Sequence, residues 1–139
     1  MNALHYAARY NRLDVVHALL DMGADVNSIA FDGKTALHFA SKEGHIQVVH
    51  ALVLAGAELD TVTTDQYSRT ALHYAAYNGN FNVVQYLVAA GSRVEITDAD
   101  GRSVITLGQC NPEIHVALTE GQSASYKQRL NSLPSTPSK

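Results

Sequence analysis

The stretch KTALHFASKEGHIQVVHALVLAGAELD, residues 34–60, contains two short amphipathic segments with a glycine between them. A similar segment precedes it, NALHYAARYNRLDVVHALLDMGADVN, and another follows it, RTALHYAAYNGNFNVVQYLVAAGSRVE. The shared histidines give the period, which is 33 residues from His5 to His38 and 35 residues from His38 to His73. An internal period of this length indicates an array of stacked repeats.

Each repeat is expected to begin with a short helix. Thr35 is a good N-cap for a helix that starts directly after it. Leu37, Ala40 and Ser41 recur at helical spacing and are small or apolar, so they are expected to face the core. Gly44 follows this segment and favours the end of a helix.

A second helix is expected over residues 46–54 of the same repeat, ended by Gly56. Its predicted buried stripe is spaced as one face of a helix and comprises Ile46, Val49, Leu52 and Val53. Residues 56–69, GAELDTVTTDQYSR, lack helical periodicity and are expected to form a loop or finger that leads to the next repeat.

The recurring TALH, GH, VV and GADVN segments resemble the ankyrin repeat, whose signature contains T-P-L-H-x-A. The resemblance covers about residues 2–120 and implies an all-α repeat fold. Helix-turn-helix units with short β-hairpin fingers would stack into a curved solenoid. Repeats are expected over about residues 1–29, 30–62 and 63–97, with a partial copy over 98–120.

The two end repeats depart from this pattern. The first copy begins inside its motif, without a finger or a polar cap helix, which suggests either a fragment or a poorly covered start. The last copy has Ser103, Thr106 and Gly108 where the pattern has Thr, His and Ala. It is still expected to form a closing helix pair, with residues 112–120 as the second helix. Residues 121–139 are rich in serine with two prolines and are expected to be a disordered tail.

Several classes of function are disfavoured. Net charge is −3, whereas a nucleic-acid binder is expected to be basic. The apolar runs are too short to span a membrane, and no signal peptide is visible. The single cysteine, Cys110, fits an intracellular protein, either cytoplasmic or nuclear.

Neither a cofactor nor a metal is expected, and no enzymatic activity. The resemblance implies that His5, His38 and His73 hydrogen-bond the Thr of their motif and the neighbouring loop. Because stacked repeats lie about 10 Å apart, these histidines cannot share one metal ion. There is neither a Gly-rich phosphate loop nor a GxSxG motif, and Cys110 with His115 lies in the degraded copy.

The resemblance instead implies a non-catalytic protein-interaction module. Phe39 lies about 200° around its helix from Leu37, so it is expected on the exposed face. Tyr6 and Tyr74 occupy the same slot, and Tyr10 and Tyr77 are one turn further on. In the ankyrin family this stripe belongs to the concave face, where partners commonly bind. The alternative interpretation is that the rings cover the helices and stack between repeats.

A row of three cations, Lys34, Arg69 and Arg102, lies beside the aromatic stripe, each directly before the N-cap of the first helix of its repeat. The finger after residue 56 is the longest. The predicted binding surface comprises Tyr6, Tyr10, Lys34, Phe39, Lys42, Glu43, Gln66, Tyr67, Arg69, Tyr74, Tyr77 and Arg102. The expected ligand is an acidic or apolar segment of another protein, bound by a monomer. The alternative is a structural stacking element, whose open first repeat docks on further repeats or self-associates.

Overall fold

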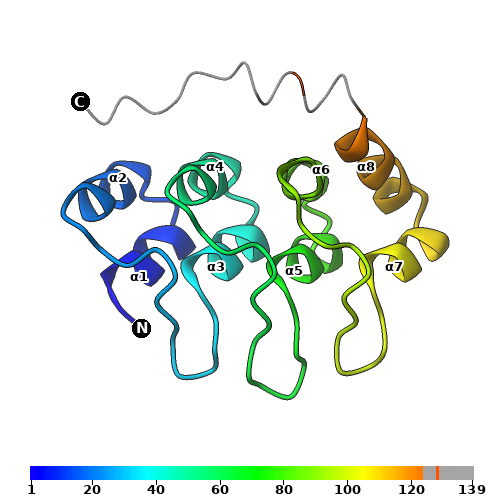
Figure 1. Ribbon diagram of the computed structural model, residues 1–139, viewed down its shortest axis with the longest axis horizontal. Helices are drawn as coiled ribbons and strands as arrows, with labels where there is room; N and C mark the ends of the chain where they lie inside the picture. The colour runs from blue at the N-terminus through cyan, green and yellow to red at the C-terminus, as the bar shows by residue number, and fades with distance from the viewer. Residues whose placement is uncertain (124–127, 129–139) are drawn as a thin grey trace.

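The computed structural model describes residues 1–123 and residue 128, and in this part the chain forms eight helices in two rows (Figure 1). The first row contains α1 (Ala3–Arg9), α3 (Ala36–Glu43), α5 (Ala71–Tyr77) and α7 (Val104–Cys110). The second row contains α2 (Leu13–Asp21), α4 (Ile46–Leu54), α6 (Phe81–Ala90) and α8 (Pro112–Gln122). Each repeat contributes one helix to each row, so the expected helix-turn-helix array is confirmed.

Three loops project beyond the first row of helices and form the fingers (Figure 1). Each finger is closed by one backbone hydrogen bond. The N–H of Ala30 donates to the Lys34 carbonyl (2.9 Å), that of Thr63 to the Arg69 carbonyl (3.0 Å) and that of Asp98 to the Arg102 carbonyl (2.8 Å). These bonds are too few to build a ladder, so within residues 1–123 the fingers are turns rather than paired strands.

In each of the first three repeats, the motif histidine hydrogen-bonds the finger that follows it. The N–H of Thr35 donates to His38 Nδ1 (2.9 Å), and the backbone N–H of His38 donates to the Thr35 hydroxyl (3.4 Å). Since Nδ1 accepts, the neutral ring carries its proton on Nε2, which donates to the Thr61 carbonyl (2.9 Å). His5 and His73 make the same contacts to the carbonyls of Ser28 and Arg102. The hydrogen bonds implied by the family resemblance are therefore confirmed for His38 and His73, and in the first repeat Asn2 takes the place of the Thr.

The core lies between the two rows of helices and between successive repeats. Leu37, Ala40 and Ser41 are fully buried, as predicted for the first helix. In α4 the predicted stripe is only partly right. Val49 and Leu52 are buried and Ile46 and Val53 are half-buried, whereas the unpredicted Val48 and Ala51 are buried as well. A helix stacked between two neighbouring repeats is covered on two sides, so its buried face is wider than that of a surface helix.

The degraded fourth copy closes the array with α7 and α8, as expected. Asn111 caps α8 by accepting the Glu113 N–H (3.0 Å), and Pro112 occupies the first helical position, where a missing N–H is harmless. Helix α8 continues to Gln122, past the expected domain end at residue 120. A Cβ on Gly121 would lie 2.6 Å from the Gln85 carbonyl oxygen, so only glycine lets α8 pack this closely on α6.

The predicted disordered tail, residues 121–139, lies mostly outside the described residues. Among the described helices, none has the length and apolar character needed to cross a lipid bilayer.

Candidate protein-interaction surface

The first cation of the predicted row lies over two aromatic rings. The Nζ atom of Lys34 is 5.9 Å from the ring centroid of Phe39 and 5.7 Å from that of Tyr74. Asp32, in the turn of the same finger, pairs with this ammonium group at 3.3 Å. Lys34 thus joins the second repeat to a ring of the third, and its half-buried side chain is held in one place.

The second cation, Arg69, lies between two tyrosine rings. Its guanidinium carbon is 4.6 Å from the centroid of Tyr67 and 4.3 Å from that of Tyr77. The Nε atom is 3.8 Å from Asp98 Oδ2, which makes an ion pair but no hydrogen bond, and this buried Nε–H has no hydrogen-bond partner. These two ring contacts hold the Arg69 guanidinium in one position.

Asp98 connects the Tyr77 side chain to the backbone of the third finger. Its Oδ2 accepts the Tyr77 hydroxyl (2.7 Å), and its Oδ1 accepts the backbone N–H groups of Asp100 and Arg102 (3.0 Å each). Burial alone would raise the pKa of Asp98, but these hydrogen bonds outweigh it and lower the pKa below the usual value. Burial, and then the bond to Asp98, raises the pKa of Tyr77. The carboxylate is therefore ionised and the phenol protonated at neutral pH.

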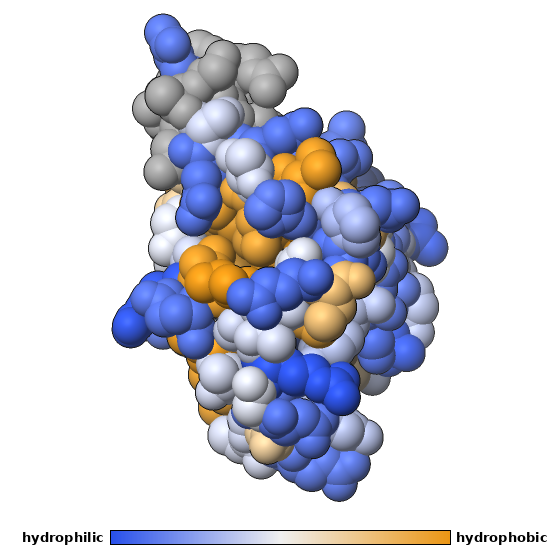
Figure 2. Space-filling view, turned by 90° about the vertical axis from the view of Figure 1, so that its right-hand side faces the viewer, coloured by the Kyte–Doolittle hydropathy of each residue, from blue (hydrophilic) through white to orange (hydrophobic). Residues whose placement is uncertain are grey.

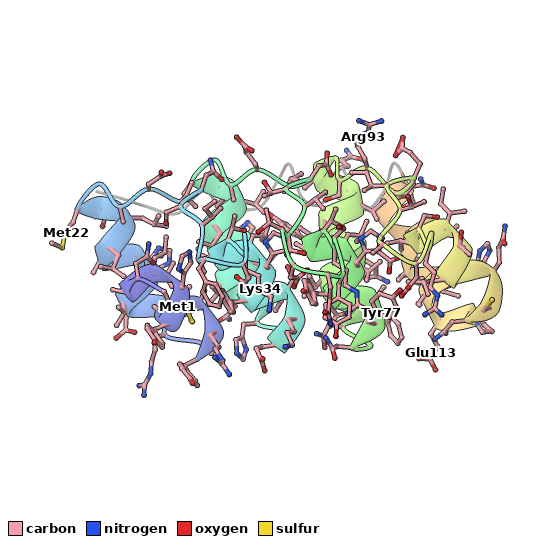
Figure 3. All side chains as sticks on the ribbon, turned by 90° about the horizontal axis from the view of Figure 1, so that it is seen from below. Met1, Met22, Lys34, Tyr77, Arg93 and Glu113 are labelled. Carbon is pink, nitrogen blue, oxygen red and sulfur yellow. The ribbon has the colours of Figure 1, made fainter. Side chains whose placement is uncertain are left out.

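These contacts bring part of the predicted surface together, and we call this part the cation–aromatic ridge. Viewed from the finger side, Lys34 and Tyr77 lie in the middle of the array, between Met22 at one end and Glu113 towards the other (Figure 3). The ridge comprises Lys34, Tyr67, Arg69, Tyr77 and Arg102. Gln66 is exposed directly beside Tyr67 in the long finger.

The prediction that Phe39 and Tyr74 are exposed is wrong. Phe39 is 8% exposed and Tyr74 is 5% exposed, because each ring packs on the motif histidine of the preceding repeat. The ring centroids of His5 and Phe39 are 5.7 Å apart, and those of His38 and Tyr74 are 5.9 Å apart. The angle around one helix places these rings opposite its buried residues, but the preceding repeat covers this side as well. For these two rings, the alternative interpretation of stacking between repeats is correct.

The structure places the other predicted residues away from the ridge. Tyr6 and Tyr10 are exposed, but they lie at the open end of the first repeat, in a hollow of about 430 Å³ that Val15 also lines. Lys42 and Glu43 are exposed on the last turn of α3, and within the described residues no hydrogen bond or ion pair joins their side chains to the ridge.

Asp98 is not among the residues that the sequence predicted for the binding surface. A usable signal was present in the order Asp98-Ala-Asp-Gly-Arg102, because an Asp at the start of a turn accepts backbone N–H groups further along the chain. In the described part of the chain, no cluster of three His, Cys, Asp or Glu side chains is arranged to hold a metal ion.

A family model described as ankyrin repeats (3 copies) matches residues 4–100. The chain belongs to the ankyrin-repeat family. Ankyrin-repeat domains are generally protein-interaction modules and are typically non-catalytic, which agrees with a surface of cations and rings. A comparison with the curated proteins gives no match.

Proposed function

We propose that this ankyrin-repeat domain is a non-catalytic, monomeric module that binds a segment of a partner protein along the cation–aromatic ridge, and that the segment carries carboxylates. The observation that supports this most strongly is the fixed position of Arg69 between Tyr67 and Tyr77. A side chain that is already ordered loses little entropy on binding, so its contacts contribute more fully to affinity.

The charges around the ridge favour an acidic ligand although the whole chain is negative. Both oxygens of Asp98 already accept hydrogen bonds from Tyr77 and from finger N–H groups. In contrast, Arg102 is exposed, whereas the Nε–H of Arg69 is buried beside Asp98. A carboxylate of the partner can accept from a guanidinium edge with two parallel bonds, which is the strongest geometry available to this pair.

The rings supply the apolar part of the surface. Tyr67 is 43% exposed, and it stands beside the exposed Gln66 in the longest finger. Tyrosine and arginine are the residue types that most often dominate binding energy at protein interfaces. Phe39 and Tyr74 act beneath them as the buried floor that positions Lys34 and Arg69. Lys42 and Glu43 would contact only a segment that extends beyond the ridge.

The test is capture of partners from cell lysate by the wild-type chain, by Arg102→Glu and by Arg93→Glu. Arg102 makes its hydrogen bonds to Asp98 and His73 through its backbone, which the substitution leaves in place, and its side chain also hydrogen-bonds Tyr77. Arg93 is the matched control, because it is an exposed cation that pairs with Glu95 (3.7 Å) away from the ridge. Thermal melting checks that all three proteins are folded.

We expect Arg102→Glu to retain a partner on the order of tenfold less than the wild type, because the reversed charge repels a carboxylate. Arg93→Glu should capture the same partner as the wild type. Equal capture by all three folded proteins would exclude the ridge as the binding surface.

A further inference from the structure

The cations of the cation–aromatic ridge have a regular spacing along the array. Lys34, Arg69 and Arg102 occupy the same position in three successive fingers, directly before the N-cap of a first helix. Stacked helix pairs lie about 10 Å apart, so one positive charge recurs at about this distance. A ligand that uses the whole row must present its negative charges with a similar spacing.

One tyrosine ring contacts each pair of neighbouring cations. Lys34 Nζ is 5.7 Å from the ring centroid of Tyr74, and the guanidinium carbon of Arg69 is 5.8 Å from it. The same carbon is 4.3 Å from the centroid of Tyr77, whose hydroxyl hydrogen-bonds the side chain of Arg102. These contacts hold the three cations in register with one another.

The three cations are open to a ligand to different degrees. Lys34 and Arg69 each pair with an aspartate of a finger, and their side chains remain 19% and 21% exposed. Arg102 is exposed. A carboxylate of the ligand can therefore contact Arg102 directly and is attracted to the partly covered charges of the other two.

The regular conformations of a bound peptide place side chains at different steps along one face. In a β-strand, neighbours on one face are about 6.6 Å apart, and the third residue along points to the other face. In a polyproline II helix, every third residue lies on the same face, with a step of about 9.3 Å. In an α-helix, a step of about 10.5 Å needs seven residues. The spacing of the ridge thus fits a polyproline II helix or an α-helix but not a strand.

The polar groups beside the row favour the polyproline II helix. Its backbone carbonyls have no internal hydrogen bonds and can accept from a receptor, whereas those of an α-helix are used internally. Gln66 and Tyr67 are exposed in the long finger and offer an amide and a hydroxyl as donors. Tyr67, which is 43% exposed, also offers ring surface to a proline, and aromatic side chains are the usual receptors for this conformation.

We propose that the segment bound by the ridge, a claim that rests on the proposed function, is a proline-rich polyproline II helix with a carboxylate at every third residue. Its carboxylates lie opposite Lys34, Arg69 and Arg102, and prolines between them contact Tyr67 and Tyr77. A chain that already has this conformation loses little entropy on binding, which complements the fixed position of Arg69.

The apolar surface at the end of the array formed by α7 and α8 does not suit such a ligand. Apolar patches are visible there among hydrophilic groups (Figure 2), and Ile105 and Val116 are 43% and 50% exposed. Among Asp, Glu, Lys and Arg, these two helices contain only Glu113 and Glu120. The end therefore repels an acidic segment, and the ridge is the surface with the complementary charge.

The test uses the full chain and two synthetic peptides of identical composition with blocked ends. The first is Glu-Pro-Pro repeated three times, which places its carboxylates on one face. The second, Glu-Pro-Pro-Pro-Glu-Pro-Pro-Pro-Glu, turns successive carboxylates by about 120° around the helix. An alanine-rich helical peptide with three glutamates, seven residues apart, represents an α-helical ligand. Fluorescence anisotropy measures the affinity of each peptide for the wild type, Arg102→Gln and the control Arg93→Gln.

We expect the period-three peptide to bind the wild type about tenfold more tightly than its isomer, because only its carboxylates match the row. Arg102→Gln should weaken this binding severalfold, and Arg93→Gln should leave it unchanged. Replacing one terminal glutamate of the peptide by glutamine should weaken binding to the wild type but not further weaken binding to Arg102→Gln, since both changes remove the same contact.

Equal binding of the two isomers would overturn the inference, whereas its loss in Arg102→Gln would still support an acidic ligand. Tighter binding of the helical peptide would assign the ridge to an α-helix instead. Binding of no peptide would also overturn the inference. The proposed function would then stand if Arg102→Glu loses the partner captured from lysate, and it would fail as well if Arg102→Glu retains that partner.

Discussion

At the scale of single residues, the motif histidine connects protonation with folding. His38 is buried, with Nδ1 accepting from Thr35 and Nε2 donating to Thr61. Burial lowers the pKa of His38 to about 4, against backbone contacts that raise it. Burial also lowers the pKa of His73. A protonated ring would lose its Nδ1 acceptor and place a charge in the interior.

This predicts that stability falls between pH 7 and pH 5. The folded pKa of His38 lies below the usual 6.5, so the unfolded chain binds more protons in this range and is favoured as the pH falls. From pH 6.5 to 5 the loss from His38 is about 2 kcal/mol, at 1.36 kcal/mol per unit. Asp65 and Asp98, whose pKa values are lowered, lose their contribution only below their usual value of 3.8.

The measurement is urea unfolding of the wild type and His38→Gln at pH 7 and pH 5. Glutamine keeps one acceptor and one donor but does not titrate. The variant should lose about 2 kcal/mol less than the wild type between the two pH values. An equal loss in both proteins would show that His38 does not couple protonation to folding.

A second residue-scale prediction concerns Gly44, which ends α3 with φ +80°. A Cβ there would lie 2.8 Å from Asn80 Oδ1, and Asn80 donates to the last carbonyls of α3. Gly101 has a similar φ of +77° with open space around it. Both Gly→Ala changes should cost about 1–2 kcal/mol for the left-handed backbone. Gly44→Ala should cost about 1 kcal/mol more than Gly101→Ala, because it also disturbs the hydrogen bonds of Asn80. Urea unfolding measures both losses of stability, and equal losses would refute this role of Asn80.

At the scale of the elements, stability comes from the contact of one helix pair with the next. Tyr74 on α5 packs on His38 of α3, whereas Tyr6 occupies the same slot on α1 and packs on no preceding repeat. Tyr74→Ala should therefore lower the free energy of unfolding by about 3–5 kcal/mol. Tyr6→Ala should change it by no more than about 0.5 kcal/mol.

Thermal and urea unfolding of the two variants check this contrast. If Tyr74→Ala does not fold, Tyr74→Leu gives a smaller loss from the same contact and replaces it. Similar stability of the variants at positions 74 and 6 would contradict the assignment of Tyr74 to the interface between repeats.

At the scale of the whole molecule, local signals predicted the helix pairs well. The N-cap at Thr35, the end at Gly44 and the span of residues 46–54 all match the structure. Each of these depends on residues a few positions apart, so one repeat contains the necessary information. The three phased copies then predicted the stacking, because each copy alone leaves its apolar face uncovered.

Features that depend on contact between repeats could not be predicted in this way. Phe39 is covered by His5, which lies 34 positions earlier, and no pattern within one helix indicates that contact. The pairing of Arg69 with Asp98 likewise joins two different fingers. The cation row was visible in the sequence, but the rings that fix its geometry became apparent only in the folded array.

The most direct test of the proposed function is site-specific photo-crosslinking to the captured partner. A photoreactive residue replaces Gln66, beside Tyr67 in the long finger, or Asn82, an exposed residue of α6 in the second row of helices. Binding along the cation–aromatic ridge predicts a crosslink to the partner from position 66 and none from position 82. A crosslink from position 82 and none from position 66 would contradict the proposed function.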